Sequence, residues 1–297
     1  MKQSERWKRG LPYVGNKARY MDAILEHTPP AHEFVDVFGG GGSSSLFAAD
    51  SGKFDIVSYN EIDTGVFTLF SEIISGNLDG FDFRSLGAVT REQFLDALHA
   101  RPTDADEIVR RQIILLCYSF SNDRQSYLWG RNIEQKRLAL ARYVLDHTSG
   151  TLAESAADMR AIINEHTACG LENFQRVSQV ERLVNIERLR GIEQTSTQRV
   201  AYDRIITSNA DYHVLPIAPD AVVYCDPPYK NAVNKYALGF DFDEFEDWLQ
   251  TLPNENVFVS SYECPRGCEL VEVVGKPRRA IAAKNKKTVE KLYKLKR

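Results

Sequence analysis

The sequence predicts an α/β protein whose sheet is interrupted by a block of helices. Strand-like runs alternate with helix-like segments near residues 33–60 and again near 204–262, a pattern that is typical of one α/β sheet. From about residue 66 to 198, strand signal is weak and apolar residues recur near helical spacing. We therefore expect a Rossmann-like domain, residues 1–66 and 200–297, with residues 67–199 as a helical insertion.

The composition is that of a folded soluble protein, with 43% hydrophobic and 26% charged residues in a chain of 297. No stretch reaches the roughly 18 uninterrupted apolar residues of a membrane span, and no apolar segment of a secretory signal follows the polar start. We expect a cytoplasmic protein that is a monomer and has no contact with a membrane. The five cysteines are scattered, so we expect reduced thiols and no metal site.

The first strand-like run, Glu33–Phe38, leads through Gly39–Gly42 into the helix-like run that starts at Ser43. A strand, a glycine turn and a helix capped by serine form the opening unit of a nucleotide-binding α/β fold, where backbone N–H groups approach a ligand. Ser44 stands where a dinucleotide motif has its third glycine, which weakens that interpretation. A flexible glycine loop is the structural alternative.

A second strand is predicted at Phe54–Tyr59, and Glu61 follows it. An acid at this point, about 20 residues past the glycines, is where such folds hold the two hydroxyls of a ribose. A surface carboxylate or a helix cap is the alternative, and Asp63 can fill the capping role instead.

Within the helical block, helices are predicted at residues 111–118, 134–147 and 180–189. The polar loop between the first two, residues 119–132, interleaves arginines, amides and aromatic rings. Such a loop can contact phosphates and base edges or wedge into a base stack, and it can equally be a plain connection between helices.

Strand signals return after the block at Arg204–Thr207 and Asp211–Tyr212. An amphipathic helix with an acidic start is predicted at Phe240–Leu249, and a strand follows at Asn256–Tyr262. Residues 271–274 and 292–295 are candidates for a closing hairpin.

Val222–Cys225 reads as a buried strand that ends at Asp226-Pro227-Pro228-Tyr229. Asp followed by Pro is ordinary turn chemistry. Two prolines that fix their own φ angles also make a rigid polar corner, which suits a functional site. The corner alone leaves both interpretations open.

Charge is uneven even though the net charge of −4 gives no global case for nucleic-acid binding. Residues 276–297 carry many lysines and arginines and the single acid Glu290. Such a run is usually a solvated face or tail, and a surface that faces phosphates is the alternative.

Five segments, taken in their order and spacing, resemble the motifs of one enzyme family. They are Tyr13–Lys17, Phe34–Gly41, Asn60–Asp63, Asp211–Tyr212 and Asp226–Tyr229. Together they resemble the S-adenosylmethionine-dependent DNA adenine-N6 methyltransferases with the D-P-P-Y signature, in the subgroup of bacterial and phage Dam-type enzymes. The resemblance covers nearly the whole chain and implies a class I methyltransferase sheet with a target-recognition insertion.

The resemblance implies S-adenosyl-L-methionine as cofactor and double-stranded DNA as substrate. Tyr13 and Lys17 would line the methionine end of the cofactor, and Asp211 would accept from its adenine amine with Tyr212 against the ring. The complete set of implied cofactor residues is Tyr13, Lys17, Asp36, Phe38, Gly39, Gly40, Gly41, Glu61, Asp211, Tyr212 and Asp226. Two positions depart from the family pattern: Val37 stands where Pro is common and Glu61 where Asp is common.

An adenine in a duplex must be flipped out before a methyl donor can reach its amine. By resemblance the catalytic residues are Asp226, Pro227, Pro228 and Tyr229. We expect Asp226 and the Pro227 carbonyl to accept from the amine and Tyr229 to stack on the base. For the DNA surface we expect Arg124, Tyr127, Arg131 and the basic C-terminal segment.

Three alternatives remain at this stage: methylation of adenine in ribosomal RNA, a nucleic-acid-binding module with a decayed site, and an NAD-dependent oxidoreductase. The intact Asp226–Tyr229 run and Glu61 speak against the second. The absent third glycine speaks against the last.

Overall fold

The computed structural model describes residues 10–168, 183–197, 202–228, 240–275, 278–279 and 287–297. The chain divides into two compact units. Unit 1 contains residues 16–67 and the described residues from 202 onward, and unit 2 contains residues 10–15 and the described residues from 68 to 197. The boundaries between the two units fall after residues 67 and 199, and the sequence predicted them after residues 66 and 199. Residues 10–15, which we expected in the sheet domain, group with the helical unit instead.

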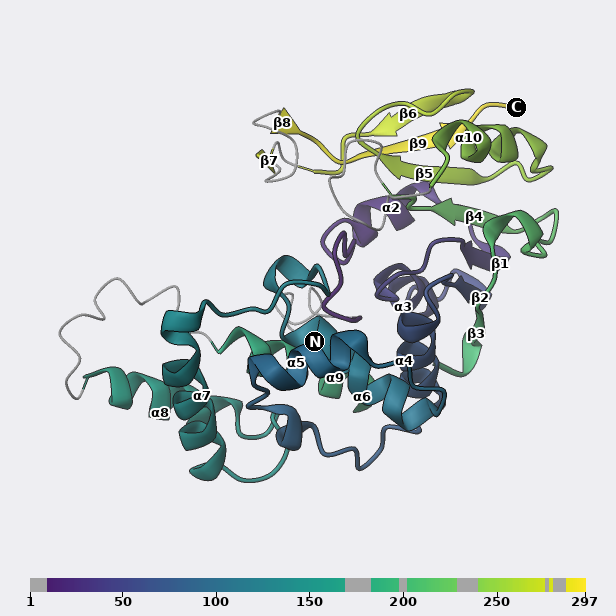
Figure 1. The fold of residues 1–297 in the computed structure, drawn as a ribbon. Helices are drawn as coiled ribbons and strands as arrows, with labels where there is room; N and C mark the ends of the chain where they lie inside the picture. Colours follow the sequence, from purple (N-terminus) through teal and green to yellow (C-terminus); the bar gives the residue numbers. More distant parts are fainter. Residues whose placement is uncertain (1–9, 169–182, 198–201, 229–239, 276–277, 280–286) are drawn as a thin grey trace. The chain divides into compact units, whose positions relative to one another are not determined.

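Unit 1 is built on a mixed sheet of seven strands in the order β3-β2-β1-β4-β5-β9-β6, which confirms the predicted α/β class (Figure 1). The five strands from β3 to β5 are parallel, and β9 is antiparallel to both of its neighbours. The strands are β1 (Ala31–Asp36), β2 (Phe54–Asn60), β3 (Ile205–Ser208), β4 (Val222–Cys225), β5 (Val257–Ser261), β6 (Cys268–Glu272) and β9 (Lys291–Leu295). A separate pair is formed by β7 (Arg278–Arg279) and β8 (Lys287–Thr288).

The strand order places a topological switch point between β1 and β4. The chain winds outward from β1 through β2 and β3 on one side, and through β4 and β5 on the other. In open α/β sheets, ligands bind outside the carboxyl ends of the strands at such a point. The fold therefore directs attention to the residues that follow β1 and β4.

The helices of unit 1 cover both faces of the sheet. They are α2 (Met21–His27), which precedes β1, and, in the connections between strands, α3 (Ser43–Asp50), α10 (Phe242–Thr251) and the short η3 (Tyr202–Arg204) and η4 (Tyr212–Val214). One face packs against α10 in a cluster formed by Val35, Val37, Tyr212, Ala221, Val223, Cys225, Phe245, Trp248, Leu249, Leu252, Val257, Val259, Cys268, Tyr293 and Leu295. The alternate residues Phe34 and Tyr224 stack on the other face, with ring centroids 6.0 Å apart.

Helix starts are set by side chains that satisfy the first backbone N–H groups. Asp241 caps α10 by accepting from the N–H groups of Asp243 and Glu244, at 2.9 and 3.0 Å. The predicted helix at residues 240–249 is therefore confirmed with a later start. Asp211 accepts from the N–H of His213 in the same way and begins η4, so the predicted strand at Asp211–Tyr212 is wrong.

Other predicted elements are found with shifted ends. The closing pair exists as antiparallel β6 and β9, with Glu272 opposite Leu292, but β6 begins earlier than residue 271. The helix predicted at residues 180–189 begins at Val184 in α9, and residues 180–182 lie outside the described part of the chain.

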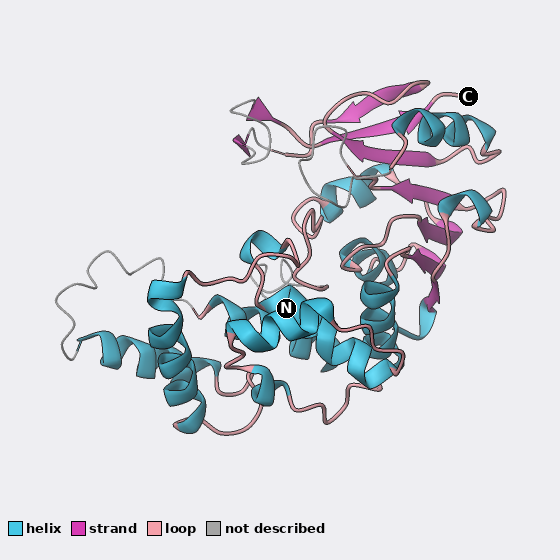
Figure 2. Cartoon of the chain, viewed as in Figure 1, coloured by secondary structure: helices cyan, strands magenta, loops and turns pink. Residues whose placement is uncertain are grey.

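Unit 2 is helical in its described residues, and the strands of Figure 2 gather in the other unit. Between the two units in sequence runs α4 (Thr64–Ser75). The elements of unit 2 are η1 (Phe83–Leu86), α5 (Arg91–His99), α6 (Ala105–Cys117), η2 (Phe120–Asn122), α7 (Arg131–Asp146), α8 (Ala156–Ala168) and α9 (Val184–Thr197). The helices predicted at 111–118 and 134–147 correspond to α6 and α7.

The core of unit 2 is organised by the buried hydroxyl of Tyr118. This hydroxyl donates to the carbonyl of Leu86 at 2.7 Å and accepts from the N–H of Val89 at 3.1 Å and the amide of Asn185 at 2.9 Å. Asn185 also donates to the carbonyl of Gly87 at 2.9 Å. One side chain thus connects the turn after η1 to α6 and α9.

We expect Tyr118→Phe to lower the free energy of unfolding by about 2–3 kcal/mol, because it leaves buried polar partners without a hydrogen bond. Urea unfolding measures this change. Tyr143→Phe on α7 is the matched control, since Tyr143 is 41% exposed, and should change stability by less than about 0.5 kcal/mol. Equal effects of the two substitutions would contradict the role of the Tyr118 hydroxyl.

Candidate functional site

The sheet register brings three carboxylates to one edge. Asp36, the last residue of β1, lies level with Tyr59 of β2 and Tyr224 of β4. Glu61 and Asp226 each follow their reference tyrosine by two residues, so both extend beyond the same edge of the sheet. Each of the two raises the pKa of Asp36 through its negative charge. The three carboxylates therefore form one cluster at the switch point.

The glycine loop after β1 needs glycine for two different reasons. A side chain at Gly39 would meet the ring of Tyr59 at 2.2 Å, and Gly40 and Gly42 have φ angles of 49° and 75°. Gly42, and not the predicted Ser43, takes the N-cap position of α3. Three serines follow as buried helical residues, which places backbone N–H groups at the cluster's edge.

Glu61 holds this loop. Its carboxylate accepts from the N–H of Gly40 at 2.9 Å and from the N–H of Asp63 at 2.7 Å. The Tyr59 hydroxyl donates to the carbonyl of Gly40 at 2.8 Å. These bonds connect the end of β2 to the glycine loop.

Asp36 is the most deeply buried of the three carboxylates, with 1% of its side chain exposed. One oxygen accepts from the Ser45 hydroxyl at 2.7 Å, and the other, Oδ1, has no hydrogen-bond partner in the structure. Burial is the main cause that raises the pKa of Asp36 to about 7, while the bonds from Ser45 oppose the change. A buried acceptor without a partner is suited to a donor from a ligand, above all a cationic one.

Lys17 and Asp226 form a buried ion pair. The Lys17 ammonium lies 2.6 Å from Oδ2 of Asp226, and the two side chains are 3% and 16% exposed. Burial by itself lowers the pKa of Lys17, but the negative charges of Asp226 and Glu290 outweigh it and raise that pKa. Lys17 therefore stays protonated beside Asp226. Its own backbone N–H donates to the Ser43 hydroxyl at 3.2 Å, which ties this segment to the start of α3.

This pairing changes the role expected for Lys17. The resemblance places it at the methionine end of a cofactor, whereas its ammonium contacts the carboxylate of the Asp-Pro-Pro corner. Pro227 and Pro228 follow Asp226 directly, and Tyr229 lies outside the described residues. Tyr13, which the resemblance also places at the methionine end of the cofactor, belongs to unit 2. Its contact with a cofactor stays a prediction.

Asp211 and Tyr212 have separate environments. The Tyr212 ring packs among Phe38, Phe240, Phe245 and Trp248, with centroids 5.0–6.0 Å away. Tyr212 and Phe38 therefore pack with the aromatic cluster on the α10 face.

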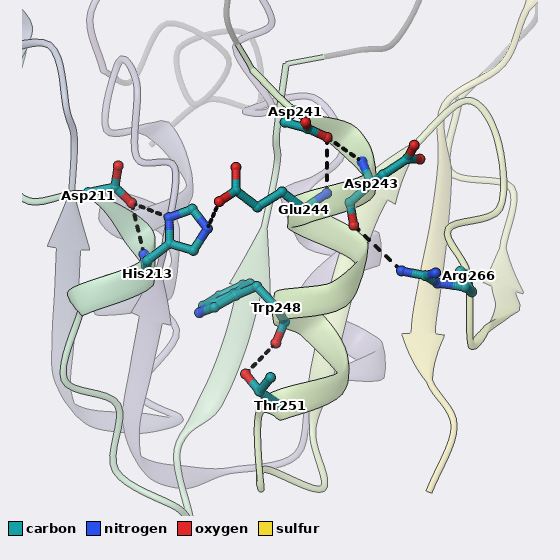
Figure 3. Close-up of polar contacts among 8 residues, drawn as sticks. All are labelled: Asp211, His213, Asp241, Asp243, Glu244, Trp248, Thr251 and Arg266. Atoms are coloured by element: carbon teal, nitrogen blue, oxygen red, sulfur yellow. Dashed lines mark hydrogen bonds and ion pairs between the residues drawn. The ribbon is translucent and has the colours of Figure 1, made fainter.

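The Asp211 side chain is 51% exposed and contacts the ring of His213. Figure 3 shows this contact and the second one from His213 to Glu244 of α10. The hydrogen bonds from His213 lower the pKa of Asp211, so it is ionised near neutral pH.

Two asparagines that the sequence reasoning missed hold the strand ends together. Asn60 donates to the carbonyls of Val37 and Ala210 at 3.1 and 3.0 Å and accepts from the hydroxyl of Ser208 at 2.8 Å. Asn209 donates to the carbonyl of Glu61 at 2.6 Å. In the sequence, the only sign of this role of Asn60 was its position directly before Glu61 at a strand end.

The loop of unit 2 differs from the prediction in which side chains it presents. Tyr127 is 9% exposed and its hydroxyl donates to the carbonyl of Val89 at 2.8 Å, so it is a core residue. Arg124 is 7% exposed with its guanidinium 5.6 Å from the ring centroid of Tyr13. The DNA contacts expected for both residues stay predictions. Arg131, the first residue of α7, is exposed, and its role stays a prediction.

The exposed aromatic of this loop is Phe120, at 59%. Ser121, Asn122 and Arg124 beside it have φ angles of 56°, 58° and 54°. Non-glycine residues rarely adopt such angles, and they persist only where surrounding contacts enforce them. Here Asp123 accepts from two backbone N–H groups of the loop, and the N–H of Phe120 donates to Ser126 at 2.7 Å.

In the described part of the basic C-terminal segment, two cationic side chains make hydrogen bonds within the fold. Lys294 donates to the side chain of Asn256 at 3.0 Å, and Arg297 donates to the carbonyls of Leu252 and Asn254. Residues 276–277 and 280–286 lie outside the described part. A surface facing phosphates is therefore not supported by Lys294 or Arg297.

Cysteine chemistry adds nothing to the site. Cys117, Cys225, Cys264 and Cys268 are free thiols, and no group of metal-binding side chains occurs among the described residues. Within the same residues, no helix combines the length and apolar character needed to cross a membrane.

Comparison with protein-family models and with curated proteins finds no match. The class that the fold and site define is an α/β protein with a carboxylate cluster and a glycine loop at the switch point of its sheet. The functional argument therefore depends on the chemistry of these residues.

The Asp36 environment predicts an unusual pH dependence of stability. Its pKa in the folded protein, about 7, exceeds the ordinary 3.8, so the folded state holds this proton more tightly than the unfolded state. The contribution is complete below the ordinary pKa and is lost as pH rises toward 7. Asp36→Asn mimics the protonated form, and we expect it to be more stable than the parent near pH 8 by up to about 4 kcal/mol.

Urea unfolding at about pH 5 and about pH 8 measures the two stabilities. Asp203→Asn, at an exposed position of unit 1, is the control and should match the parent at both values. An Asp36→Asn advantage that is the same at both pH values would show that Asp36 does not titrate in this range.

Proposed function

We propose that the protein is a methyltransferase that transfers the methyl group of S-adenosylmethionine to N6 of an adenine flipped out of double-stranded DNA. The observation that carries this proposal is the pairing of Asp226 with Lys17 immediately before two prolines, at the end of β4. This arrangement supports a rigid acceptor at the place where α/β sheets bind their ligands.

The carboxylate cluster fits the cationic cofactor. S-adenosylmethionine carries an ammonium and a sulfonium group and supplies an electrophilic methyl when bound. Oδ1 of Asp36 is a buried acceptor without a partner, and Glu61 and the N–H groups of the glycine loop lie at the same sheet edge. Asp36 would hold the ammonium, the loop the carboxylate and Glu61 the ribose hydroxyls, with Asp211 accepting from the adenine amine.

Asp226 acts as a hydrogen-bond acceptor. An adenine amine is a weak nucleophile because its lone pair is delocalised into the ring. A carboxylate that accepts one amine hydrogen and the Pro227 carbonyl that accepts the other orient the lone pair toward the methyl donor. Lys17 keeps Asp226 ionised, and an ammonium-paired carboxylate is a weak base. The proton therefore leaves the methylated amine to water, and Asp226 stays charged.

Unit 2 supplies the contact with DNA in this proposal. Its loop presents Phe120 at 59% exposure on a backbone held by the Asp123 turn, and Arg131 is exposed at the start of α7. An exposed ring on a fixed loop suits insertion between bases, which lowers the cost of extruding one of them. The aromatic wedge assigned here is Phe120, in place of Tyr127.

Two observations bear on the alternatives. A dinucleotide-binding sheet continues with a sixth parallel strand beyond β5, whereas β9 in that position is antiparallel, which favours the methyltransferase over an NAD enzyme. The partly buried, paired Asp226 and the partnerless oxygen of Asp36 are costly features that a decayed site would have no reason to keep. Ribosomal RNA as substrate is separated from DNA by the assay below.

We expect Asp226→Asn to lower the rate of methyl transfer about 100- to 1,000-fold, because a neutral amide is a weaker acceptor and its NH₂ cannot accept. Incorporation of tritiated methyl into duplex DNA measures this, and detection of N6-methyladenine identifies the product. Cofactor binding by calorimetry should persist. Asp220→Asn, at an exposed position before β4, should keep full activity.

Asp226→Ala alone leaves the Lys17 ammonium buried without its partner, so Lys17→Met with Asp226→Ala is the second inactive variant. Full activity of Asp226→Asn would remove Asp226 from the mechanism. Incorporation into RNA but not DNA would transfer the proposal to an RNA substrate.

We expect Phe120→Ala to weaken DNA binding about 5- to 100-fold, given about 1–3 kcal/mol for one stacking contact. Fluorescence anisotropy with a labelled duplex measures binding, and 2-aminopurine at the target base reports flipping. Leu95→Ala on α5 removes another exposed apolar side chain of unit 2 and is the control. Unchanged binding and flipping in Phe120→Ala would show that the loop tip does not enter the DNA.

A further inference from the structure

His213 lies between two carboxylates that come from different elements (Figure 3). Its Nδ1 is 2.6 Å from Oδ1 of Asp211, and its Nε2 is 3.3 Å from Oε1 of Glu244. The same Oδ1 also accepts from the backbone N–H of His213 at 3.0 Å. His213 thereby makes two hydrogen bonds to Asp211 and one longer polar contact to Glu244 of α10.

The contact with Asp211 is a hydrogen bond. An ionised carboxylate can only accept, so Nδ1 of His213 carries the proton of this bond. The contact of Nε2 with Glu244 is a longer polar contact at 3.3 Å.

The second contact fixes the ring to a rigid support. Glu244 lies in the first turn of α10, behind the Asp241 cap, and the next residue of that helix, Phe245, is in the core. The Tyr212 ring lies against the imidazole, with centroids 3.9 Å apart. Through these contacts the position of the Asp211 carboxylate is set by the core of unit 1.

We propose that His213 is a positioning residue for the nucleoside end of the cofactor site, and that its ring holds Asp211 in place to accept from an adenine amine. This inference rests on the proposed function, in which Asp211 is that acceptor. One oxygen of Asp211 accepts from His213, which leaves the other oxygen for the ligand. Loss of the ring removes this anchor, so affinity for the adenine nucleoside falls.

The test uses two ligands that differ at position 6 of the purine: S-adenosylhomocysteine, which carries an amine there, and S-inosylhomocysteine, which carries a carbonyl there and a proton on N1. Calorimetry with the full-length protein gives two dissociation constants for each variant. We expect the parent to prefer the adenosyl ligand, and His213→Gln to lose about fivefold of this preference.

The inosyl ligand separates positioning from general damage. A purely structural role of His213 would weaken both ligands equally and leave the preference intact, which would overturn the inference. Glu244→Gln removes the carboxylate that faces Nε2 and should also reduce the preference, which provides a second variant if His213→Gln unfolds.

His32→Gln is the matched control, because His32 contacts Asp55 at 3.0 Å at the opposite edge of the sheet. It should leave both constants unchanged. If the parent binds neither ligand, the proposed function fails together with this inference. If the parent binds and prefers the adenosyl ligand but His213→Gln behaves identically, the inference alone fails.

Discussion

The buried ion pair of Lys17 and Asp226 is the interaction on which the rest of the site depends. Its partners come from the segment before α2 and from the end of β4, and each lowers the cost of removing the other's charge from water. The pair fixes the N-terminal segment against the start of α3, where the Lys17 N–H reaches the Ser43 hydroxyl. It also sets the charge of the Asp-Pro-Pro corner. One contact thus determines both where this carboxylate lies and that it is ionised.

The sheet register brings carboxylates together, and a ligand with positive charge would reduce their mutual repulsion. Asp36, Glu61 and Asp226 converge at one edge, and only Asp226 has a cation beside it among the contacts described above. Burial and its two acidic neighbours keep Asp36 partly protonated near neutral pH. A ligand that carries positive charge would ionise Asp36 and gain the partnerless Oδ1 as acceptor. This energetic cost in the free protein is what makes the site selective for a cationic ligand in the proposed function.

The sequence predicted the features that follow from local pattern. The strand, the glycine turn after β1, the acid after β2 and the corner after β4 all occur where strand propensity meets residues with special backbone requirements. It could not predict the features that depend on pairing across the fold. Nothing in the spacing showed that Lys17 reaches Asp226, that His213 bridges two carboxylates, or that Tyr127 is buried while Phe120 is exposed. In a polar loop, the aromatic residues look equivalent until packing selects one for the core.

The two departures from the family pattern have structural consequences that suit the site. Val37 donates its N–H to the carbonyl of Tyr224 at 3.0 Å, a bond that proline could not make, so β1 and β4 stay paired up to the switch point. Glu61 reaches back to the N–H of Gly40 at 2.9 Å. The shorter side chain of aspartate would have one methylene less with which to span that distance. The glutamate therefore shapes the glycine loop before any ligand arrives.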